Sequence, residues 1–260
     1  MKTVVIIPAR YQSSRYPGKP LVMLRGKDGV AKSLIQRSWE AAKAVRGVDA
    51  VYVATDDDRI KAVSEAFGAE VIMTSEACAN GTERCADALQ YLPQAFDLYV
   101  NLQGDAPLTP AWFVEDLIAE MKAHPDVQMA TPVLRCDAET YANFVEDRLH
   151  GRVGGTTAVF DGRMNALYFS KEVVPYTGKT FGPADEIPVF HHVGVYAYRE
   201  PALRAYAGWP SGPLEKYEGL EQLRFLENGV PIRCVQVDGR GKVFWELNNP
   251  VDVARIEGVL

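Results

Sequence analysis

The chain has 260 residues, 47% of them apolar, which is enough for one sizeable α/β domain. Its formal net charge of −6 argues against nucleic acid as the main partner. No apolar run approaches the roughly 18 residues of a membrane span, and an immediate N-terminal strand leaves no room for a signal peptide. Four cysteines without a CxxC pair are typical of free thiols, not of a zinc site. We therefore expect a cytoplasmic protein without a membrane or nucleic-acid partner.

Apolar runs alternate with amphipathic stretches through the first half of the chain. Helical spacing marks the segments that begin near Leu34, Ile60 and Cys85. Strand patterns occupy 3–8, 50–54, 70–73, 98–102 and 128–134. Strands separated by helices predict right-handed crossovers and a mostly parallel sheet covered on both faces. Ligands of such sheets bind beyond the carboxyl ends of the strands.

The pattern changes near residue 135, but no clean domain boundary follows, so we expect one domain over 1–260. The section from about 136 to 212 reads as an insertion that covers the site, binds an acceptor or makes a dimer contact. The remaining predicted elements are strands at 166–170, 191–198 and 231–237, a helix around 215–228 and a helix near 250–258.

A basic loop follows the first strand and carries Arg10, Arg15 and Lys19. Three cations at the carboxyl end of a strand suit a polyanion, most simply a nucleoside triphosphate. The alternative is a solvated loop with scattered charge. An acidic protein with one basic loop favours a small-anion site over a nucleic-acid surface.

Two segments could provide metal ligands. Asp105 follows the predicted strand at 98–102. A carboxylate at this point could hold Mg²⁺, although turns commonly contain aspartate. Glu246 and Asn248 stand two residues apart in an extended segment, so both side chains lie on the same side.

The segment from Asn80 to Arg84 opens a helix, where free N–H groups could bind an anion or a base edge, or Thr82 could simply cap the helix. His191 and His192 are adjacent on a strand, so at most one faces a given pocket. Four further polar residues read by default as a solvated helix face: Glu215, Glu218, Glu221 and Gln222.

The sequence shows no Ser/His/Asp triad, nucleophilic cysteine, Walker A motif or GxGxxG. Cations plus a metal-binding aspartate without a nucleophile fit direct phosphoryl or nucleotidyl transfer, in which the protein positions groups and stabilises charge.

In combination, these segments resemble the 3-deoxy-manno-octulosonate (Kdo) cytidylyltransferases, also called CMP-Kdo synthetases. The matching motifs run in order along nearly the whole chain: Ile6-Ile-Pro-Ala-Arg-Tyr11, Arg15-Tyr-Pro-Gly-Lys-Pro-Leu21, Val53-Ala-Thr-Asp56, Gly81-Thr-Glu-Arg84, Val100-Asn-Leu-Gln-Gly-Asp105, Ala166-Leu-Tyr-Phe-Ser170, His192-Val-Gly-Val-Tyr196, and Leu214-Glu215 with Leu220-Glu-Gln-Leu-Arg224.

The resemblance implies a nucleotidyltransferase-type α/β fold, a cytoplasmic homodimer, CTP and Mg²⁺. The hydroxyl of an acidic sugar would attack the α-phosphate of CTP, and Arg10, Arg15 and Lys19 would offset charge on the departing pyrophosphate. The full nucleotide set is Ala9, Arg10, Ser14, Arg15, Lys19, Gly81, Thr82, Arg84 and Gln103. The acceptor set is Gln103, Lys171, His191, His192, Tyr196, Glu221 and Gln222, and the metal set is Asp105, Glu246 and Asn248.

The chain also departs from the family pattern around the metal and the acceptor. Ala106 and Asn248 stand where the family has acids, so we expect Glu246 to supply the missing carboxylate. Lys171, Gly178 and His191 replace arginines, which bind carboxylates bidentately. The acceptor could therefore be Kdo, an amino-modified Kdo, another acidic sugar or a small phosphonate. A different possibility is a non-catalytic nucleotide-binding protein with a lost metal site.

Overall fold

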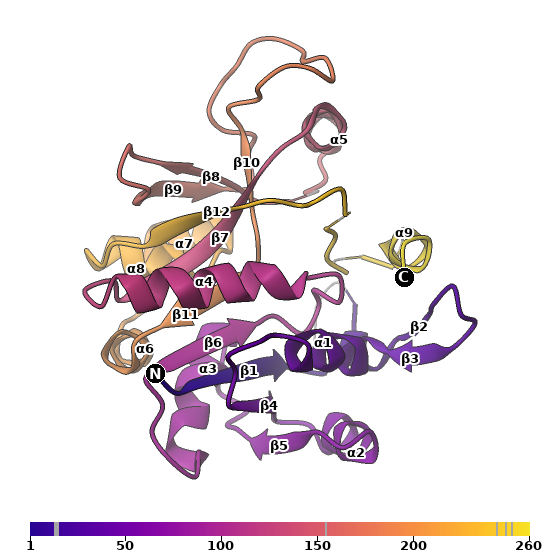
Figure 1. The fold of residues 1–260 in the computed structure, drawn as a ribbon, viewed down its shortest axis with the longest axis vertical. Coiled ribbons are helices and arrows are strands. Elements are labelled where there is room, and N and C mark those ends of the chain that lie inside the picture. The colour runs from indigo at the N-terminus through magenta and orange to yellow at the C-terminus, as the bar shows by residue number, and fades with distance from the viewer. Residues whose placement is uncertain (13–15, 154, 243, 248, 251) are drawn as a thin grey trace.

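The computed structural model describes residues 1–12, 16–153, 155–242, 244–247, 249–250 and 252–260. Within them, ten strands form one sheet in the order β5, β4, β1, β6, β11, β7, β10, β8, β9, with β12 beside β7. The strands expected in the first half are present to within one residue at either end: β1 (Thr3–Ala9), β4 (Ala50–Thr55), β5 (Glu70–Met73), β6 (Leu98–Leu102) and β7 (Met129–Arg135). The expected α/β fold is confirmed (Figure 1).

The part of the sheet formed by β5, β4, β1 and β6 is parallel, as helical crossovers require. Alternate residues of β1 enter different cores, with Val5 and Ile7 on one face and Val4 and Ile6 on the other. The crossover helices are α1 (Leu34–Lys43), α2 (Asp58–Ala66), α3 (Gly81–Ala88) and α4 (Ala111–Ala123), with a 3-10 turn at Leu89–Tyr91 after α3. Helices α1, α2 and α4 pack on the first face and α3 on the second, so the sheet is covered on both sides.

The section 136–212 extends the same sheet with antiparallel strands. Its elements are α5 (Ala138–Leu149), β8 (Thr157–Phe160), β9 (Ala166–Ser170), β10 (Phe190–His192), β11 (Val195–Tyr198) and α6 (Glu200–Gly208). The single strand expected over 191–198 is wrong. It divides at Val193 and Gly194, because β10 pairs with β7 and β8 whereas β11 lies between β6 and β7.

The helix expected around 215–228 is also wrong, since two short helices replace it: α7 (Pro213–Glu218) and α8 (Leu223–Glu227). Gly219 ends α7 in the left-handed conformation with φ +61°, which turns the chain before α8. The turn changes which side chains are buried. Gln222 is 1% exposed although a solvated face was expected for it, and Tyr217 is 91% exposed.

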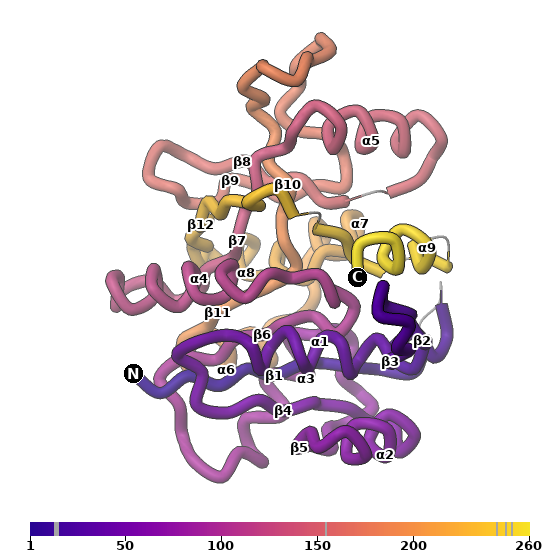
Figure 2. Tube along the Cα trace, turned by 45° about the vertical axis from the view of Figure 1, so that its right-hand side comes forward, coloured from indigo at the N-terminus to yellow at the C-terminus, as the bar shows by residue number. Residues whose placement is uncertain are grey.

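The C-terminal part returns to the N-terminal half of the molecule. Strand β12 (Arg233–Val237) runs parallel to β7, and helix α9 (Asp252–Glu257) lies beside the hairpin of β2 (Met23–Arg25) and β3 (Ala31–Ser33), which follows a 3-10 turn at Lys19–Leu21 (Figure 2). The Arg25 amide donates to Glu257 Oε1 at 2.7 Å. The Leu247 amide donates to the Asp105 carbonyl at 2.9 Å, which brings the preceding Glu246 to the end of β6. In the described part of the chain, no helix is both long and apolar enough to span a bilayer.

Candidate active site

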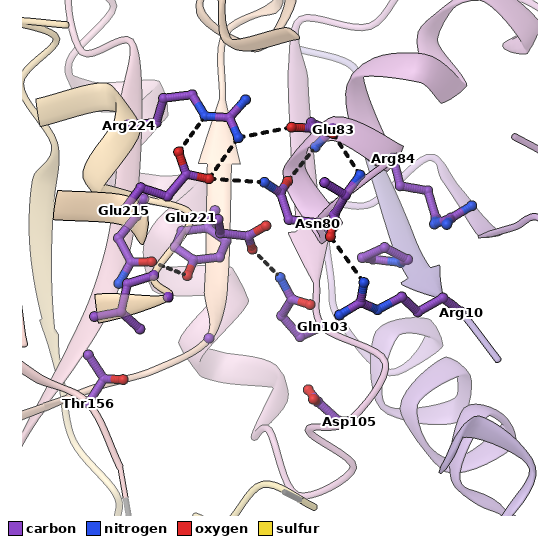
Figure 3. Close-up of a pocket in the computed structure, with 18 of the residues that line it drawn as sticks. Arg10, Asn80, Glu83, Arg84, Gln103, Asp105, Thr156, Glu215, Glu221 and Arg224 are labelled. Carbon is purple, nitrogen blue, oxygen red and sulfur yellow. Dashed lines mark hydrogen bonds and ion pairs between the residues drawn. The ribbon is translucent and has the colours of Figure 1, made fainter. Parts of the chain in front are cut away.

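A cavity of about 820 Å³ opens beyond the carboxyl ends of β1 and β6. The loops after these two strands contribute one wall, and the segment from Glu215 to Arg224 contributes the facing wall (Figure 3). A cavity of this size can enclose most of a ligand larger than a simple ion. It lies where the sequence placed the ligand, at the carboxyl edge of the parallel strands.

The basic loop contributes Ala9, Arg10 and Lys19 to the cavity walls. Arg10 is exposed, and its Nη1 donates to the Ala79 carbonyl at 3.1 Å. Lys19 Nζ lies 2.6 Å from Asp105 Oδ2. Both cations therefore have fixed partners at the cavity edge. The expected triphosphate ligands Ser14 and Arg15 lie outside the described residues.

Helix α3 points its N-terminus at the cavity, where Gly81 and Asn80 line the wall. Asn80 caps the helix by accepting from the Glu83 amide at 2.8 Å, so the expectation that Thr82 is the cap was wrong. The Thr82 side chain is fully buried, and its hydroxyl bonds to that of Tyr198 at 2.9 Å. Thr82 is therefore not part of the cavity lining, and it contributes to the site through its backbone amide, which donates to Glu221 Oε2.

Arg84 reaches the cavity wall but is 2% exposed and already has partners. Its Nη2 lies 3.2 Å from Asp56 Oδ1, and its Nη1 donates to the Thr74 hydroxyl at 2.5 Å. The two aspartates before α2 have structural roles, because Asp57 caps that helix and Asp56 holds Arg84. These contacts hold Arg84 in a fixed position on the cavity wall.

Asp105 and Glu246 bring two carboxylates to the same cavity. The Gly194 amide donates to Glu246 Oε1 at 3.3 Å, and a Cβ at position 194 would stand 2.8 Å from that oxygen, so a larger residue there would displace the Glu246 carboxylate. Asn248 lies outside the described residues, and Ala106 is fully buried and supplies no ligand.

The two carboxylates, Asp105 and Glu246, suit a magnesium ion that is also bound by substrate phosphates better than a metal ion bound only by protein side chains. No cluster of three or more His, Cys, Asp or Glu that could hold a metal occurs among the described residues. Mg²⁺ is usually bound by one or two carboxylates together with substrate phosphates. Asp105 and Glu246 would meet that requirement once a triphosphate is present.

Glu221 contacts both the loop after β6 and the first turn of α3. Gln103 Nε2 donates to Glu221 Oε1 at 2.6 Å, and the Thr82 amide donates to Oε2 at 2.9 Å. Burial raises the pKa of Glu221 to about 7; the two bonds from Thr82 oppose the shift, and the negative charges of Asp105 and Glu215 add to it. The carboxyl group is consequently near the midpoint of its titration at neutral pH.

Gln222 presents an unused donor beside this carboxyl group. Its Oε1 accepts from the Tyr196 hydroxyl at 3.1 Å, and its buried Nε2 has no partner among the described residues. Burying an amide N–H without a partner is costly. Because Gln222 and Tyr196 both line the cavity, the free N–H is suited to an acceptor oxygen.

His192 lines the cavity as a neutral imidazole, since burial lowers its pKa to about 3. The Thr131 hydroxyl donates to the Val195 carbonyl at 2.8 Å, so it can only accept from His192 Nε2, 3.0 Å away. This network assigns the proton to Nε2 and leaves Nδ1 as an acceptor. His192 is therefore suited to a sugar hydroxyl and not to a carboxylate.

The other positions where family arginines are replaced lie at different distances from the cavity. Lys171 lines it, and its amide donates to Glu218 Oε2 at 2.9 Å. His191 is outside the cavity walls, with its ring 4.9 Å from that of Phe144, so the structure gives it no acceptor contact. Gly178 is outside them too, in a turn with φ +64°.

Three charged wall residues were missed as site residues: Glu83, Glu215 and Arg224. All three occur within matched motifs, so the motifs contained a signal that was not used. Glu215 is 7% exposed, and a reading of residues 215–228 as one continuous helix concealed its burial.

The fold and the cavity define a nucleotidyl-transferring class of protein, and comparison with known proteins identifies the family. The model of the cytidylyltransferase family matches residues 4–233, so the chain belongs to the cytidylyltransferases. It is 44% identical over 260 residues to the 3-deoxy-manno-octulosonate cytidylyltransferase of Maricaulis maris (strain MCS10), covering 100% of this chain and 97% of that protein.

Two further relatives bear on the substrates. The chain is 43% identical over 235 residues to the 8-amino-3,8-dideoxy-manno-octulosonate cytidylyltransferase of Shewanella piezotolerans (strain WP3 / JCM 13877), covering 90% of this chain and 89% of that protein. The solved structure of a CMP:2-keto-3-deoxy-manno-octonic acid synthetase complexed with CTP matches with a TM-score of 0.82 and 34% identity, covering 99% of this chain and 98% of that chain.

Proposed function

We propose that this cytidylyltransferase transfers CMP from CTP to Kdo and releases pyrophosphate. The observation that carries the proposal is one cavity with two differently equipped walls. Arg10, Lys19 and Asp105 offer charge for a metal-bound triphosphate, and Gln222, Tyr196 and His192 offer neutral groups for an acceptor. The full-length similarity to a Kdo cytidylyltransferase and to a CTP-bound synthetase supports the same assignment.

In this mechanism the protein positions two substrates and stabilises charge. An acceptor hydroxyl attacks the α-phosphorus of CTP and loses its proton to solvent, and the bond from that phosphorus to the pyrophosphate oxygen breaks. Arg10 and Lys19 hold the β- and γ-phosphates and offset the charge that accumulates on pyrophosphate. Asp105 and Glu246 would hold Mg²⁺, which supplies further neutralisation of the phosphate oxygens when it is bound.

The acceptor wall orients the sugar acid through neutral hydrogen bonds. Gln222 Nε2 donates to an acceptor oxygen, and His192 Nδ1 accepts from a hydroxyl. Lys171 provides the cation on this wall for the carboxylate. A single ammonium cannot form the bidentate contact of an arginine, so the carboxylate is held less rigidly than in the family pattern.

The 8-amino sugar acid is the second candidate acceptor, because relatives that act on it match the chain at nearly the same identity. An ammonium group on the acceptor would suit acidic wall residues, and Glu215 and Glu221 are both present. The two acceptors differ at one substituent, so they can be compared in the same assay.

Pyrophosphate release from CTP, with Mg²⁺ and each acceptor in turn, tests the proposal. We expect turnover with Kdo, and a higher kcat/KM for Kdo than for its 8-amino derivative. A reversed preference assigns the protein to the second acceptor. Binding of CTP without pyrophosphate release from any acceptor would contradict an enzymatic role.

We also propose a homodimer that works in the cytoplasm, as the family resemblance implies. Section 136–212 supports the dimer, because it exposes apolar side chains such as Leu167 (63%) and Tyr176 (93%). Light scattering after size exclusion should give twice the chain mass of 28.7 kDa. If a Leu167→Lys variant is still dimeric, Leu167 does not lie in the dimer interface.

A further inference from the structure

Arg224 has an unusual set of partners for a residue outside the triphosphate loop. Its guanidinium is 3% exposed and forms two bonds of 2.7 Å with the two carboxylate oxygens of Glu215. The same Nη2 lies 2.9 Å from Glu83 Oε1, and the guanidinium stacks 4.1 Å from the ring centre of Tyr206. Arg224 thus joins three elements: α3, α6 and α7.

On the proposed nucleotide side, Glu83 is connected to Arg10 of the basic loop through the backbone of Ala79. Its second oxygen, Oε2, accepts from the Ala79 amide at 2.7 Å. The carbonyl of the same residue, Ala79, accepts from Arg10 Nη1 at 3.1 Å. Figure 3 shows the continuous path from Arg224 through Glu83 to Arg10. The residue proposed to hold the triphosphate is therefore oriented by a glutamate that Arg224 holds.

On the acceptor side, Arg224 belongs to the segment that presents Glu221 and Gln222. A second connection runs parallel to the first, because Asn80 Nδ2 donates to the Tyr206 hydroxyl at 2.9 Å and that hydroxyl donates to the Glu221 carbonyl at 3.1 Å. The N-terminus of α3 and the acceptor wall are consequently joined through two links.

We propose that Arg224 and Glu83 are positioning residues that couple the CTP subsite to the acceptor subsite. They fix the distance between the α-phosphorus and the attacking hydroxyl without taking part in the chemistry. The inference rests on the proposed transfer from CTP to Kdo. Positioning errors of about 1 Å can cost about a hundredfold in rate, so a rigid connection between two substrates has a large kinetic effect.

Glu83→Gln is the sharpest test because it removes the charge and little else. The amide oxygen of glutamine can still accept from the Ala79 amide, and Arg224 keeps its bidentate partner Glu215, so no buried charge is stranded. Tyr206→Phe removes the parallel link and keeps the ring that stacks on Arg224. Glu115→Gln is the matched control, since Glu115 pairs with Arg46 at 2.6 Å outside the cavity lining.

The experiment combines CTP calorimetry without acceptor, initial rates over a grid of CTP and Kdo, and thermal unfolding. For Glu83→Gln we expect a CTP Kd within about threefold of wild type and a kcat/KM for Kdo at least about tenfold lower. Tyr206→Phe should act in the same direction, and the Glu115→Gln control should match wild type. The losses should persist at low temperature, where each variant is fully folded.

The outcomes separate this inference from the proposed function. Wild-type enzyme without turnover on Kdo would contradict both. An active wild type with unchanged Glu83→Gln and Tyr206→Phe kinetics would overturn only the coupling role. A large loss of CTP affinity alone would show direct contact with the nucleotide, and activity that recovers on cooling would show a purely structural role, so either also overturns it.

Discussion

Asp105 has two proposed roles, because it contacts the triphosphate-binding Lys19 and is also a candidate Mg²⁺ ligand. Its carboxylate contacts Lys19 at 2.6 Å and shares the cavity with Glu246. Asp105→Asn keeps the size but removes the charge needed by a metal and by Lys19. We expect kcat/KM to fall about a hundredfold or more, measured as pyrophosphate release at saturating Mg²⁺. Asp116→Asn, on α4 and outside the cavity lining, is the control and should leave turnover unchanged.

Glu246 is the residue that we expect to replace the acid missing at position 248. Glu246→Gln should raise the Mg²⁺ concentration needed for half-maximal rate by about tenfold or more, because an amide oxygen is a weaker ligand than a carboxylate. A magnesium titration of the initial rate measures this shift. Near-normal activity with an unshifted Mg²⁺ dependence would contradict a ligand role.

The raised pKa of Glu221 should make the protein less stable as the pH rises. Burial raises its pKa from 4.5 to about 7, so the folded protein binds this proton more tightly than the unfolded chain does. The resulting stabilisation is complete below about pH 4.5 and is lost as the pH rises through about 7. Glu221→Gln removes this titration. Between about pH 5 and about pH 8, wild type should lose on the order of 2 kcal/mol more unfolding free energy than the variant.

Urea unfolding of both proteins at the two pH values measures the difference. Other titrating groups are common to both proteins and largely cancel. A variant that loses as much unfolding free energy as wild type over this range would show that Glu221 does not have a raised pKa.

At the level of secondary-structure elements, the short turn between α7 and α8 sets the positions of Glu221 and Gln222, two residues proposed to contact the acceptor. Gly219 adopts φ +61°, which is unfavourable for any residue with a Cβ. Gly219→Ala should lower the free energy of unfolding by about 1 kcal/mol and raise the KM for Kdo, because the turn positions Glu221 and Gln222. The binding of CTP alone should change little.

Gly229→Ala is the matched control, since Gly229 follows α8 with φ +73° and open space around its Cβ position. It should cost a similar free energy of unfolding without changing the KM for Kdo. If both variants change the KM equally, the turn at Gly219 has no specific role in acceptor binding.

The same elements show how far the sequence predicts the structure. The five strands of the first half were located to within one residue, because β1, β4 and β6 are buried runs rich in apolar residues and β5 and β7 contain short apolar stretches between polar segments. The helix expected over 215–228 was wrong because helical periodicity continues across Gly219, and the sequence pattern does not reveal a left-handed turn. Most predicted cavity residues do line the cavity, since motifs cluster at strand ends. The roles of Arg224 and Glu83 depend on tertiary pairing between distant segments, which no local pattern encodes.

At the scale of the whole molecule, the cavity exists because distant parts of the chain meet at one edge of the sheet. The parallel strands supply the basic loop and Asp105, the antiparallel section supplies His192 and Tyr196, and the C-terminal segment returns with Glu246. This arrangement places the cations Arg10 and Lys19 on one side of the cavity and the neutral hydrogen-bonding groups of Gln222, Tyr196 and His192 on another, with Glu215 paired to Arg224 in the wall between helices α7 and α8. The separation suits a reaction in which one substrate carries a triphosphate and the other offers a hydroxyl.

The transfer of CMP to Kdo is tested by identifying the product formed from CTP, Kdo and Mg²⁺ with phosphorus NMR and mass spectrometry. We expect one CMP-Kdo and one pyrophosphate for each CTP consumed, and we expect Asp105→Asn to lose this reaction. CTP consumption that yields free CMP, or no consumption with Kdo while another acceptor is converted, would contradict transfer to Kdo.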